Sequence, residues 1–379
     1  MRNGIPADRQ VGSVVKESIP GYRPNLTPLT KEKGVCLEPV QLGFRSFNRQ
    51  WIIPDIRVIT QPNAELWGSR SDHQIYLTAP TDVSPTSGPA LTFTALVPDK
   101  HHYNGRGGRA FPLWRDQKAT VPNMPQNLLV YLSLRYGGPI MPDDLMAYIA
   151  ATAAHPAFVK RFRNDLSTPG VRIPIPADAA TFREAVELGR TVIWLHTFGE
   201  RMADPNNGRP AQPPRLPADR APRVPTAGEI PQDPSLMPDT INYDAGKKRL
   251  LIGTGYVEPV EPGVWNYEVS GKQVLSQWFS YRKANRERPL IGDRRPPSPL
   301  CGIQPDYWLA EYTTELINVL NVLGMLVDLE PVQAKLLETI CTGPTISTEE
   351  LNAVGAFAAS AKSKKISGPQ GPDLFGNVQ

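Results

Sequence analysis

Apolar side chains recur at helical spacing in the middle of the chain. A helix is predicted to begin at Asp178, because the apolar positions after it are four, three and four residues apart and share one face. These positions are Phe182, Val186, Gly189 and Ile193. A second helix is predicted from Pro142, whose first turn is acidic, to a break at His155-Pro156. We interpret both faces as packing surfaces, and His155 and His196 as core residues.

The first third of the chain has a different pattern. From Gly43 onward, aromatic and β-branched residues form a run that ends at Pro54-Asp55, and arginines are interleaved with them. Further strands are predicted from Gln74 to Thr78, from Leu91 to Val97 and from Arg109 to Trp114. Together these patterns predict an α+β fold in which an antiparallel or mixed β-sheet region is followed by helices.

The stretch from Trp265 to Arg295 combines both patterns. Its first residues predict a short strand, Ser270-Gly271 a turn, and the residues after the turn a helix. The apolar residues of this helix are Val274, Leu275, Trp278 and Tyr281. We therefore expect a C-terminal strand-turn-helix unit. Helical spacing continues from Trp308 to Leu326, and Pro331 is predicted to open a further helix.

Composition divides the chain into five segments. Ten prolines lie between Pro205 and Pro238, a density that neither a helix nor a sheet tolerates. This part is interpreted as an extended connection on the surface, with a disordered linker as the alternative. The segments are an extended arm, disordered unless docked, at 1–42; a β-rich and then helical part at 43–202; the Pro-rich connection at 203–240; a second part at 241–345; and a C-terminal helix with a flexible tail at 346–379.

Positive charge is concentrated in one place. The whole chain carries a formal net charge of +4. From Gly271 to Arg295, seven lysines and arginines outnumber two acids, a net of +5, whereas Gln304 to Cys341 carries six acids and one lysine, a net of −5. Clustered cations beside aromatic side chains suit a polyanion such as nucleic acid. A solvated basic loop is the alternative. The acidic helices are expected to support the basic unit or to contact a partner domain.

Helix geometry separates the cations of the basic stretch. With about 100° per residue, Lys272 and Lys283 lie opposite the apolar face, where they are expected to contact phosphates. Arg282 falls within the apolar arc, so it is either paired in the core or released where the helix ends. Arg286 and Arg288 complete the candidates in this stretch.

A second group of candidate cations lies in the first third of the chain. Arg45 and Arg49 alternate with aromatic residues, and they either line a groove or cover the wet face of a sheet. The Gly-rich loop from Asp99 to Gly108 adds Lys100 and Arg106, and Arg109 follows it.

Several chemistries are disfavoured by the residues present. His101-His102 has no acidic or cysteine partners at ligand spacing, so we expect a solvent-facing hairpin loop and no metal site. The three cysteines are far apart, which argues against zinc knuckles and disulfides and favours a reducing cytoplasm. No apolar run reaches membrane-spanning length, and the N-terminus lacks the apolar core of a signal peptide.

Several separate motifs resemble one known family. The run Tyr267-Glu-Val-Ser-Gly-Lys-Gln-Val-Leu-Ser-Gln-Trp-Phe-Ser-Tyr-Arg282 is similar to part of the C-terminal target-specificity domain of type ISP restriction-modification enzymes. The resemblance extends in the family's order over roughly Gly43 to Thr342. The other motifs are Phe44–Asp55, Phe111-Pro-Leu-Trp114, Tyr148–Pro156, Arg172-Ile-Pro-Ile-Pro176 and Trp308–Leu316.

The resemblance implies a DNA-recognition module that positions an adenine methyltransferase and a helicase-nuclease on double-stranded DNA. The chain shows no Asn-Pro-Pro-Tyr loop, no Gly-rich turn for S-adenosylmethionine and no P-loop, and Val97-Pro-Asp-Lys100 lacks the second half of a nuclease motif. No catalytic residue is therefore assigned, and S-adenosylmethionine, ATP and Mg²⁺ are expected on partner domains. The alternatives are a methyltransferase or nuclease with unrecognised motifs, and a non-catalytic interaction or decoy protein.

Overall fold

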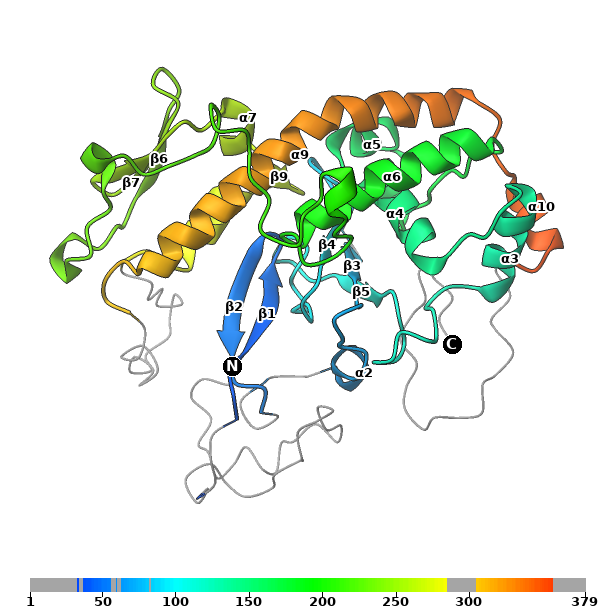
Figure 1. The fold of residues 1–379 in the computed structure, drawn as a ribbon, viewed down its shortest axis with the longest axis horizontal. Helices are drawn as coiled ribbons and strands as arrows, with labels where there is room; N and C mark the ends of the chain where they lie inside the picture. Colours follow the sequence, from blue (N-terminus) through cyan, green and yellow to red (C-terminus); the bar gives the residue numbers. More distant parts are fainter. Residues whose placement is uncertain are drawn as a thin grey trace.

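A computed structural model describes residue 33 and residues 37–55, 59, 63–81, 83–284 and 305–356. Long helices lie along the upper side of the molecule in Figure 1, and short strands lie below them and at the left. Every paired strand in this part of the chain is antiparallel, apart from an isolated parallel bridge between Gly43 and Pro98. The predicted α+β class is confirmed.

The N-terminal third forms two small sheets. Strands β3 (Tyr76–Ala79), β4 (Thr92–Thr94) and β5 (Arg109–Pro112) pair in the order β4-β3-β5, close to the predicted positions. The run after Gly43 is β-structured, as predicted, and a turn that the sequence analysis did not include divides it into two strands, β1 (Val40–Arg45) and β2 (Asn48–Ile52). The turn between them places Phe47 at φ 61°, a conformation that Gly or Asn usually signals in a sequence. Helix α2 (Ala64–Gly68) follows.

The middle helices begin where the sequence predicts. Helix α4 (Pro142–Ala153) ends before His155, and α5 (Pro156–Arg161) starts at the proline. The carboxylate of Asp178 accepts a hydrogen bond from the Thr181 backbone N–H and caps α6 (Ala179–His196). Both His155 and His196 are buried, as expected. The other helical elements here are α3 (Gln126–Arg135) and the 3-10 turn η2 (Asp165–Ser167).

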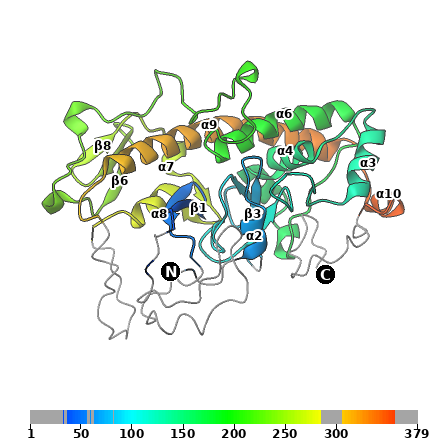
Figure 2. The ribbon, with the colours of Figure 1, turned by 60° about the horizontal axis from the view of Figure 1, so that its bottom comes forward.

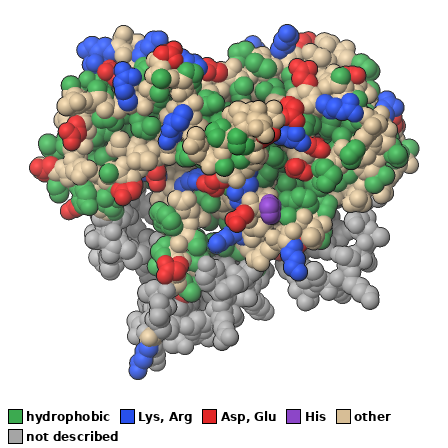
Figure 3. All heavy atoms as spheres, in the orientation of Figure 1, with side chains coloured by type: hydrophobic (Ala, Val, Ile, Leu, Met, Phe, Trp, Pro, Cys, Tyr) green, Lys and Arg blue, Asp and Glu red, His purple; other side chains and the backbone are tan. Residues whose placement is uncertain are grey.

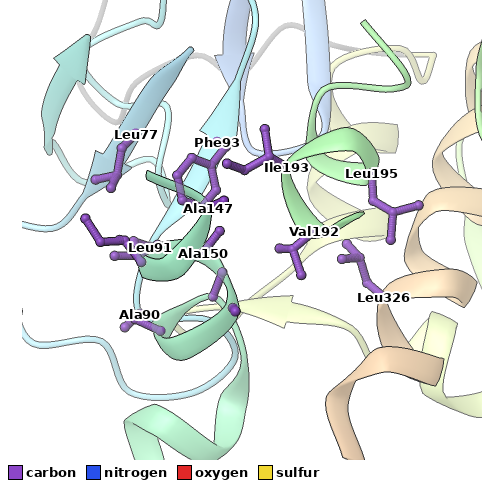
Figure 4. Close-up of a cluster of buried hydrophobic side chains, with 14 of the residues drawn as sticks. Leu77, Ala90, Leu91, Phe93, Ala147, Ala150, Val192, Ile193, Leu195 and Leu326 are labelled. Carbon is purple, nitrogen blue, oxygen red and sulfur yellow. The ribbon is translucent and has the colours of Figure 1, made fainter. Parts of the chain in front are cut away.

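One continuous core joins the sheet to the helices. Figure 4 shows Leu77, Leu91 and Phe93 from the sheet region facing side chains of α4 and α6, with Leu326 reaching the same cluster from a later helix. Helices α4 and α6 cross closely because Gly189 has no side chain; a Cβ there would collide with the Ala147 carbonyl. The parts of the chain before and after the Pro-rich connection therefore share their apolar interior.

The Pro-rich connection packs against several later and earlier elements, including the long helix that contains Asn321 and Asp328. Its regular structure consists of the 3-10 turns η3 (Pro205–Asn207), η4 (Thr226–Gly228) and η5 (Pro234–Leu236). The Leu216 N–H donates to Asn321 Oδ1 at 2.7 Å, and Arg220 pairs with Asp328 at 2.6 Å. These contacts attach the Pro-rich connection to the rest of the protein.

The second part of the chain contains a sheet that the sequence analysis missed. Strands β6 (Ile241–Asp244), β7 (Arg249–Ile252) and β8 (Gly255–Val257) pair in sequence order. Helix α7 (Pro262–Trp265) follows, so the predicted strand is wrong at Trp265, because Pro262 starts a helical turn there. The strand-turn-helix unit consists of β9 (Glu268–Val269), β10 (Lys272–Gln273) and α8 (Val274–Ser280).

A single long helix, α9 (Ala310–Thr342), crosses the top of the molecule (Figure 1). The prediction that Pro331 opens a separate helix was wrong. Pro331 is exposed, and core residues on both sides of it, such as Leu326 and Leu336, hold one continuous helix against the same interior. Helix α10 (Thr348–Ala353) ends the described part. No helix among the described residues is long and apolar enough to cross a membrane.

Candidate nucleic-acid interface

The strand-turn-helix unit is built by a two-residue hairpin. Ser270 and Gly271 both have positive φ, 48° and 74°, which fits the twist of the short strands on either side. The turn docks on an earlier loop: the Ser270 and Gly271 N–H groups donate to the Ser87 carbonyl and Oγ, each at 2.9 Å. Lys272 follows the turn and is exposed.

The apolar face of α8 lies where the helical spacing predicts. Val274, Leu275 and Trp278 are buried, together with Phe279, which the sequence analysis did not include. Tyr281 is half-buried and packs edge-on against Phe44 with the ring centroids 4.8 Å apart. Ring contact thus joins the end of α8 to the β1–β2 hairpin.

Arg282 is paired in the core, the first of the two positions predicted for it. Its side chain is 3% exposed and forms an ion pair with Glu315 at 2.8 Å. It also donates to Trp278 O and Asn48 Oδ1, each at 3.0 Å, and lies over the Trp278 ring at 3.9 Å. This position removes Arg282 from the candidate DNA contacts, because its guanidinium is engaged within the protein.

The two hairpin arginines are also ion-paired. Arg45 bonds to Asp99 at 2.7 Å and lies over the Phe44 ring, with an exposed fraction of 12%. Arg49 pairs with Glu200 and stacks over Phe198 at 4.4 Å. Each therefore links the hairpin to a neighbouring segment, which leaves less of its charge for an external phosphate.

The loop between β4 and β5 is anchored by a buried histidine. His102 Nδ1 lies 2.9 Å from Thr78 Oγ1, and burial lowers the pKa of His102 to about 3, with a further contribution from Arg45. The loop was expected to face solvent, and this expectation is wrong at His102, which is buried. Lys100, Arg106 and Arg109 are exposed on the same loop and its edge.

These separate segments meet on one surface. A Cβ at Gly105 would lie 3.3 Å from Gln277 Nε2 and 3.8 Å from Arg45 Nε, so the loop touches both α8 and the hairpin. The Tyr103 hydroxyl donates to Pro89 O at 2.7 Å, next to the loop that holds the Ser270-Gly271 turn. Figure 2 shows α8 beside β1 on this side of the molecule. We call the exposed cations Lys100, Arg106, Arg109 and Lys272 the basic face.

The remaining sequence candidates stand apart from this group. Lys283 is half-buried at the end of α8, and Arg286 and Arg288 lie outside the described residues. No group of three or more His, Cys, Asp or Glu side chains in the described part of the chain could hold a metal ion.

A second cluster of cations was missed. In Figure 3, Lys and Arg side chains gather at the upper left, in the part of the molecule that Figure 1 labels β6 and β7. Lys247-Lys248-Arg249 lies there, a run of three cations that was readable in the sequence. Lys248 pairs with Glu261 at 2.9 Å and Arg249 with Glu258 at 2.6 Å, so much of this charge is neutralised internally.

Comparison with known proteins identifies relatives of this fold. The model of the type ISP C-terminal specificity domain family matches residues 19–315. No curated protein matches the chain. The fold is similar to that in the structure of a DrdV–DNA complex, with 15% identity and a TM-score of 0.53 over 91% of this chain and 32% of that one.

It is also similar to the ATP-dependent type ISP restriction-modification enzyme LlaBIII bound to DNA, with 12% identity and a TM-score of 0.51 over 82% of this chain and 19% of that one. This chain therefore spans a third or less of the length of these two similar chains.

Proposed function

Since the chain belongs to the type ISP C-terminal specificity domain family, we propose that it is the DNA target-recognition module of a restriction-modification enzyme. The basic face is its phosphate-binding surface. The module holds the duplex in a fixed register, and side chains beside the basic face read base edges.

One observation carries this proposal: four exposed cations on the loop from Asp99 to Gly108, on its edge and beside the Ser270-Gly271 turn are not neutralised by an ion pair within the described residues. None of Lys100, Arg106, Arg109 and Lys272 forms an ion pair with another described residue, whereas Arg45, Arg49 and Arg282 all do. A cation that is already neutralised gains little from a phosphate. The four unpaired cations retain their full charge for the counterion release that drives DNA binding.

The partner domains supply the chemistry. We propose that an adenine methyltransferase and a helicase-nuclease of the same system bind S-adenosylmethionine, ATP and Mg²⁺, and that this chain binds none of them. The size of the relatives supports this division, since an ATP-dependent type ISP enzyme is about five times as long as the part that this chain resembles. The assembly works in the cytoplasm, where its DNA lies.

Salt-dependent binding to a labelled duplex tests the function. The chain should bind double-stranded DNA, and the logarithm of its affinity should fall linearly with the logarithm of salt concentration, by about 0.9 per phosphate contact. A Lys100→Ala, Arg106→Ala, Arg109→Ala variant should bind every sequence more weakly and with a flatter slope.

Lys335→Ala is the matched control, because Lys335 is an exposed cation on the acidic helix α9, and it should leave the slope unchanged. Equal slopes for the parent and the triple variant would place the DNA surface elsewhere. Absence of any binding to duplex DNA would refute the proposed function itself.

A further inference from the structure

A cleft of about 570 Å³ opens beside the β1–β2 hairpin, outside the basic face. Its walls come from the hairpin, the segment after α6, the Pro-rich connection and α9. The residues that define its chemistry are Gln41, Arg49, Phe198, Glu200, Arg201 and Gln212. A volume of this size lies within the range of about 300–1,000 Å³ that small-molecule sites occupy.

The cleft presents amide groups that have no partner. Within the described residues, neither the Gln41 nor the Gln212 side chain makes a hydrogen bond, and both line the cleft. Each amide offers two N–H donors and one carbonyl acceptor. The Arg201 guanidinium, by contrast, is held by backbone carbonyls, including Gln74 O at 2.8 Å and Ser71 O at 3.1 Å. The Gln41 and Gln212 amides can therefore bind a flat ligand that has hydrogen-bond donors and acceptors along one edge.

The cleft also presents flat surfaces. The Arg49 guanidinium carbon lies 4.4 Å over the centroid of the Phe198 ring, so these two flat side chains together form one wall of the cleft. Trp51 is directly opposite Gln41 in the hairpin register and is 62% exposed. A side chain at this position shares a face of the hairpin with Gln41 and Arg49. An exposed indole at the rim adds a second plane for stacking.

Backbone strain is concentrated in the same walls. Phe47 and Phe198 both line the cleft, and both have positive φ, 61° and 56°. This conformation is a rare outlier for a bulky residue, and such outliers gather where the surrounding structure serves a function. Gly199 brings the Pro-rich connection close, since a Cβ there would collide with the Gln212 carbonyl.

The charges of the cleft select against a phosphate. Asp72, Glu200 and Glu315 line it against two guanidinium groups, those of Arg49 and Arg201. Because Arg49 already pairs with Glu200, the cleft has no concentration of positive charge for an anion. It suits an uncharged planar heterocycle, whose amino groups can donate hydrogen bonds to the exposed Asp72 carboxylate.

We propose that this cleft holds a single nucleobase extruded from the DNA duplex that the basic face binds. The inference rests on the proposed function. The base enters the cleft edge-first, between the wall formed by Phe198 and Arg49 and the amides of Gln41 and Gln212. Trp51 either fills the gap that the extruded base leaves in the duplex or stacks on the adjacent base. The β1–β2 hairpin joins the two sites, since Arg45 contacts the basic loop and Arg49 lines the cleft.

Binding to duplexes with one unpaired nucleotide tests this inference. Three labelled duplexes of one sequence are compared: fully paired, with a central adenosine bulge, and with the same bulge lacking its base. The adenosine bulge removes the cost of unpairing, so the chain should bind it about tenfold or more tightly than the paired duplex. The abasic bulge bends the DNA equally but offers no base, and should bind like the paired duplex.

Variants assign the effect to the cleft. The Gln41→Ala, Gln212→Ala variant and the Trp51→Ala variant should each lose most of the preference for the bulged base while keeping the affinity for paired DNA. Gln117→Ala, an exposed glutamine in another loop, is the matched control and should keep the preference. Thermal unfolding of each variant verifies that it remains folded.

The outcomes separate this inference from the proposed function. Salt-dependent binding to all three duplexes with equal affinity would overturn the extruded-base site and leave the proposed function standing. The site would also be overturned if the abasic bulge were preferred equally, or if the glutamine variant kept the preference. No binding to any of the duplexes would refute the proposed function.

Discussion

Arg282, which follows α8, and Glu315 of α9 meet in an ion pair 2.8 Å long. The same guanidinium reaches Asn48 Oδ1, more than two hundred residues earlier, and stacks on Trp278. One side chain therefore connects α8, α9 and the β1–β2 hairpin, which form walls of the cleft and an edge of the basic face.

Replacing Arg282 should destabilise the protein. Arg282→Ala leaves Asn48 and the partly buried Glu315 without their partner, and loss of one member of such a pair costs about 3 kcal/mol. Equilibrium unfolding in urea should show a lower midpoint. Glu315→Gln keeps an oxygen acceptor and should cost less. If Arg282→Ala were as stable as the parent, water would be replacing the interactions of Arg282 with Asn48 and Glu315.

The sequence predicted the elements with strong local signals. The fixed φ of Pro142 and the capping carboxylate of Asp178 each mark the start of a helix, and Ser270-Gly271 marks a tight turn. The structure confirms all three boundaries. Phe47 is neither Gly nor Asn, so its positive φ has no signal in the sequence, and the turn of the hairpin was missed. Pro331 carries a misleading signal, which tertiary packing overrides.

The candidate site was predictable only in part. A sequence shows where the lysines and arginines are, but it does not show which of them form ion pairs. The acids that neutralise Arg45, Arg49 and Arg282 lie 54, 151 and 33 residues away along the chain. The cleft gave no signal at all, since Gln41 and Gln212 are unremarkable glutamines until the fold brings them together. The structure thus separates the cations that form ion pairs within the protein from those that can bind an external phosphate.

The basic residues around α8 should contribute to DNA affinity without contributing to specificity. A Lys272→Ala variant should bind all duplexes more weakly, and its salt slope should fall by about 0.9 for the lost phosphate contact. Fluorescence anisotropy over a salt series measures both quantities. If affinity and slope both match the parent, the cations around α8 are a solvated surface and the loop from Lys100 to Arg109 carries the interaction.

Close helix packing should make Gly189 irreplaceable. Alanine normally stabilises a helix interior by about 1 kcal/mol relative to glycine. At Gly189 the added methyl group would collide with the Ala147 carbonyl, and such overpacking costs about 1–3 kcal/mol, so Gly189→Ala should destabilise the protein. The change in melting temperature of Gly189→Ala shows whether the substitution destabilises or stabilises the protein. Gly246→Ala, whose added Cβ would lie 3.5 Å from an Asp244 side-chain oxygen, is the control for a glycine with room around it.

Three buried histidines should make the protein sensitive to mild acid. Burial lowers the pKa of His102 and His196 to about 3 and that of His155 to about 4, from an ordinary value of 6.5. Below pH 6.5 the unfolded chain takes up protons that the folded chain does not bind, so stability falls with falling pH. Each histidine contributes about 1.4 kcal/mol per pH unit until its folded pKa is reached.

Urea unfolding at pH 7 and pH 5 checks this dependence. His102→Asn removes one titrating group and should reduce the loss of stability between the two pH values, at some cost in stability at pH 7. An unchanged difference in this variant would show that the pKa of His102 is the same in the folded and the unfolded protein.

The chain alone should perform no methyl transfer. Purified protein incubated with duplex DNA and labelled S-adenosylmethionine should leave the DNA unlabelled, and calorimetry should detect no binding of the methyl donor. Adding the cognate methyltransferase domains should produce labelled DNA. If the isolated chain transferred the label to DNA, the assignment as a recognition module would be wrong, and the chain would be an enzyme.

The shared apolar interior constrains how such a module acquires a new target. Leu77 before the Pro-rich connection and Leu326 after it belong to one cluster, so a recombination event within residues 203–240 would unite two half-cores from different ancestors. Most hybrids of that kind would fold poorly. New specificities are therefore expected to spread by exchange of the whole module, or by point substitutions in its loops, and chimaeric enzymes should be spliced outside this unit.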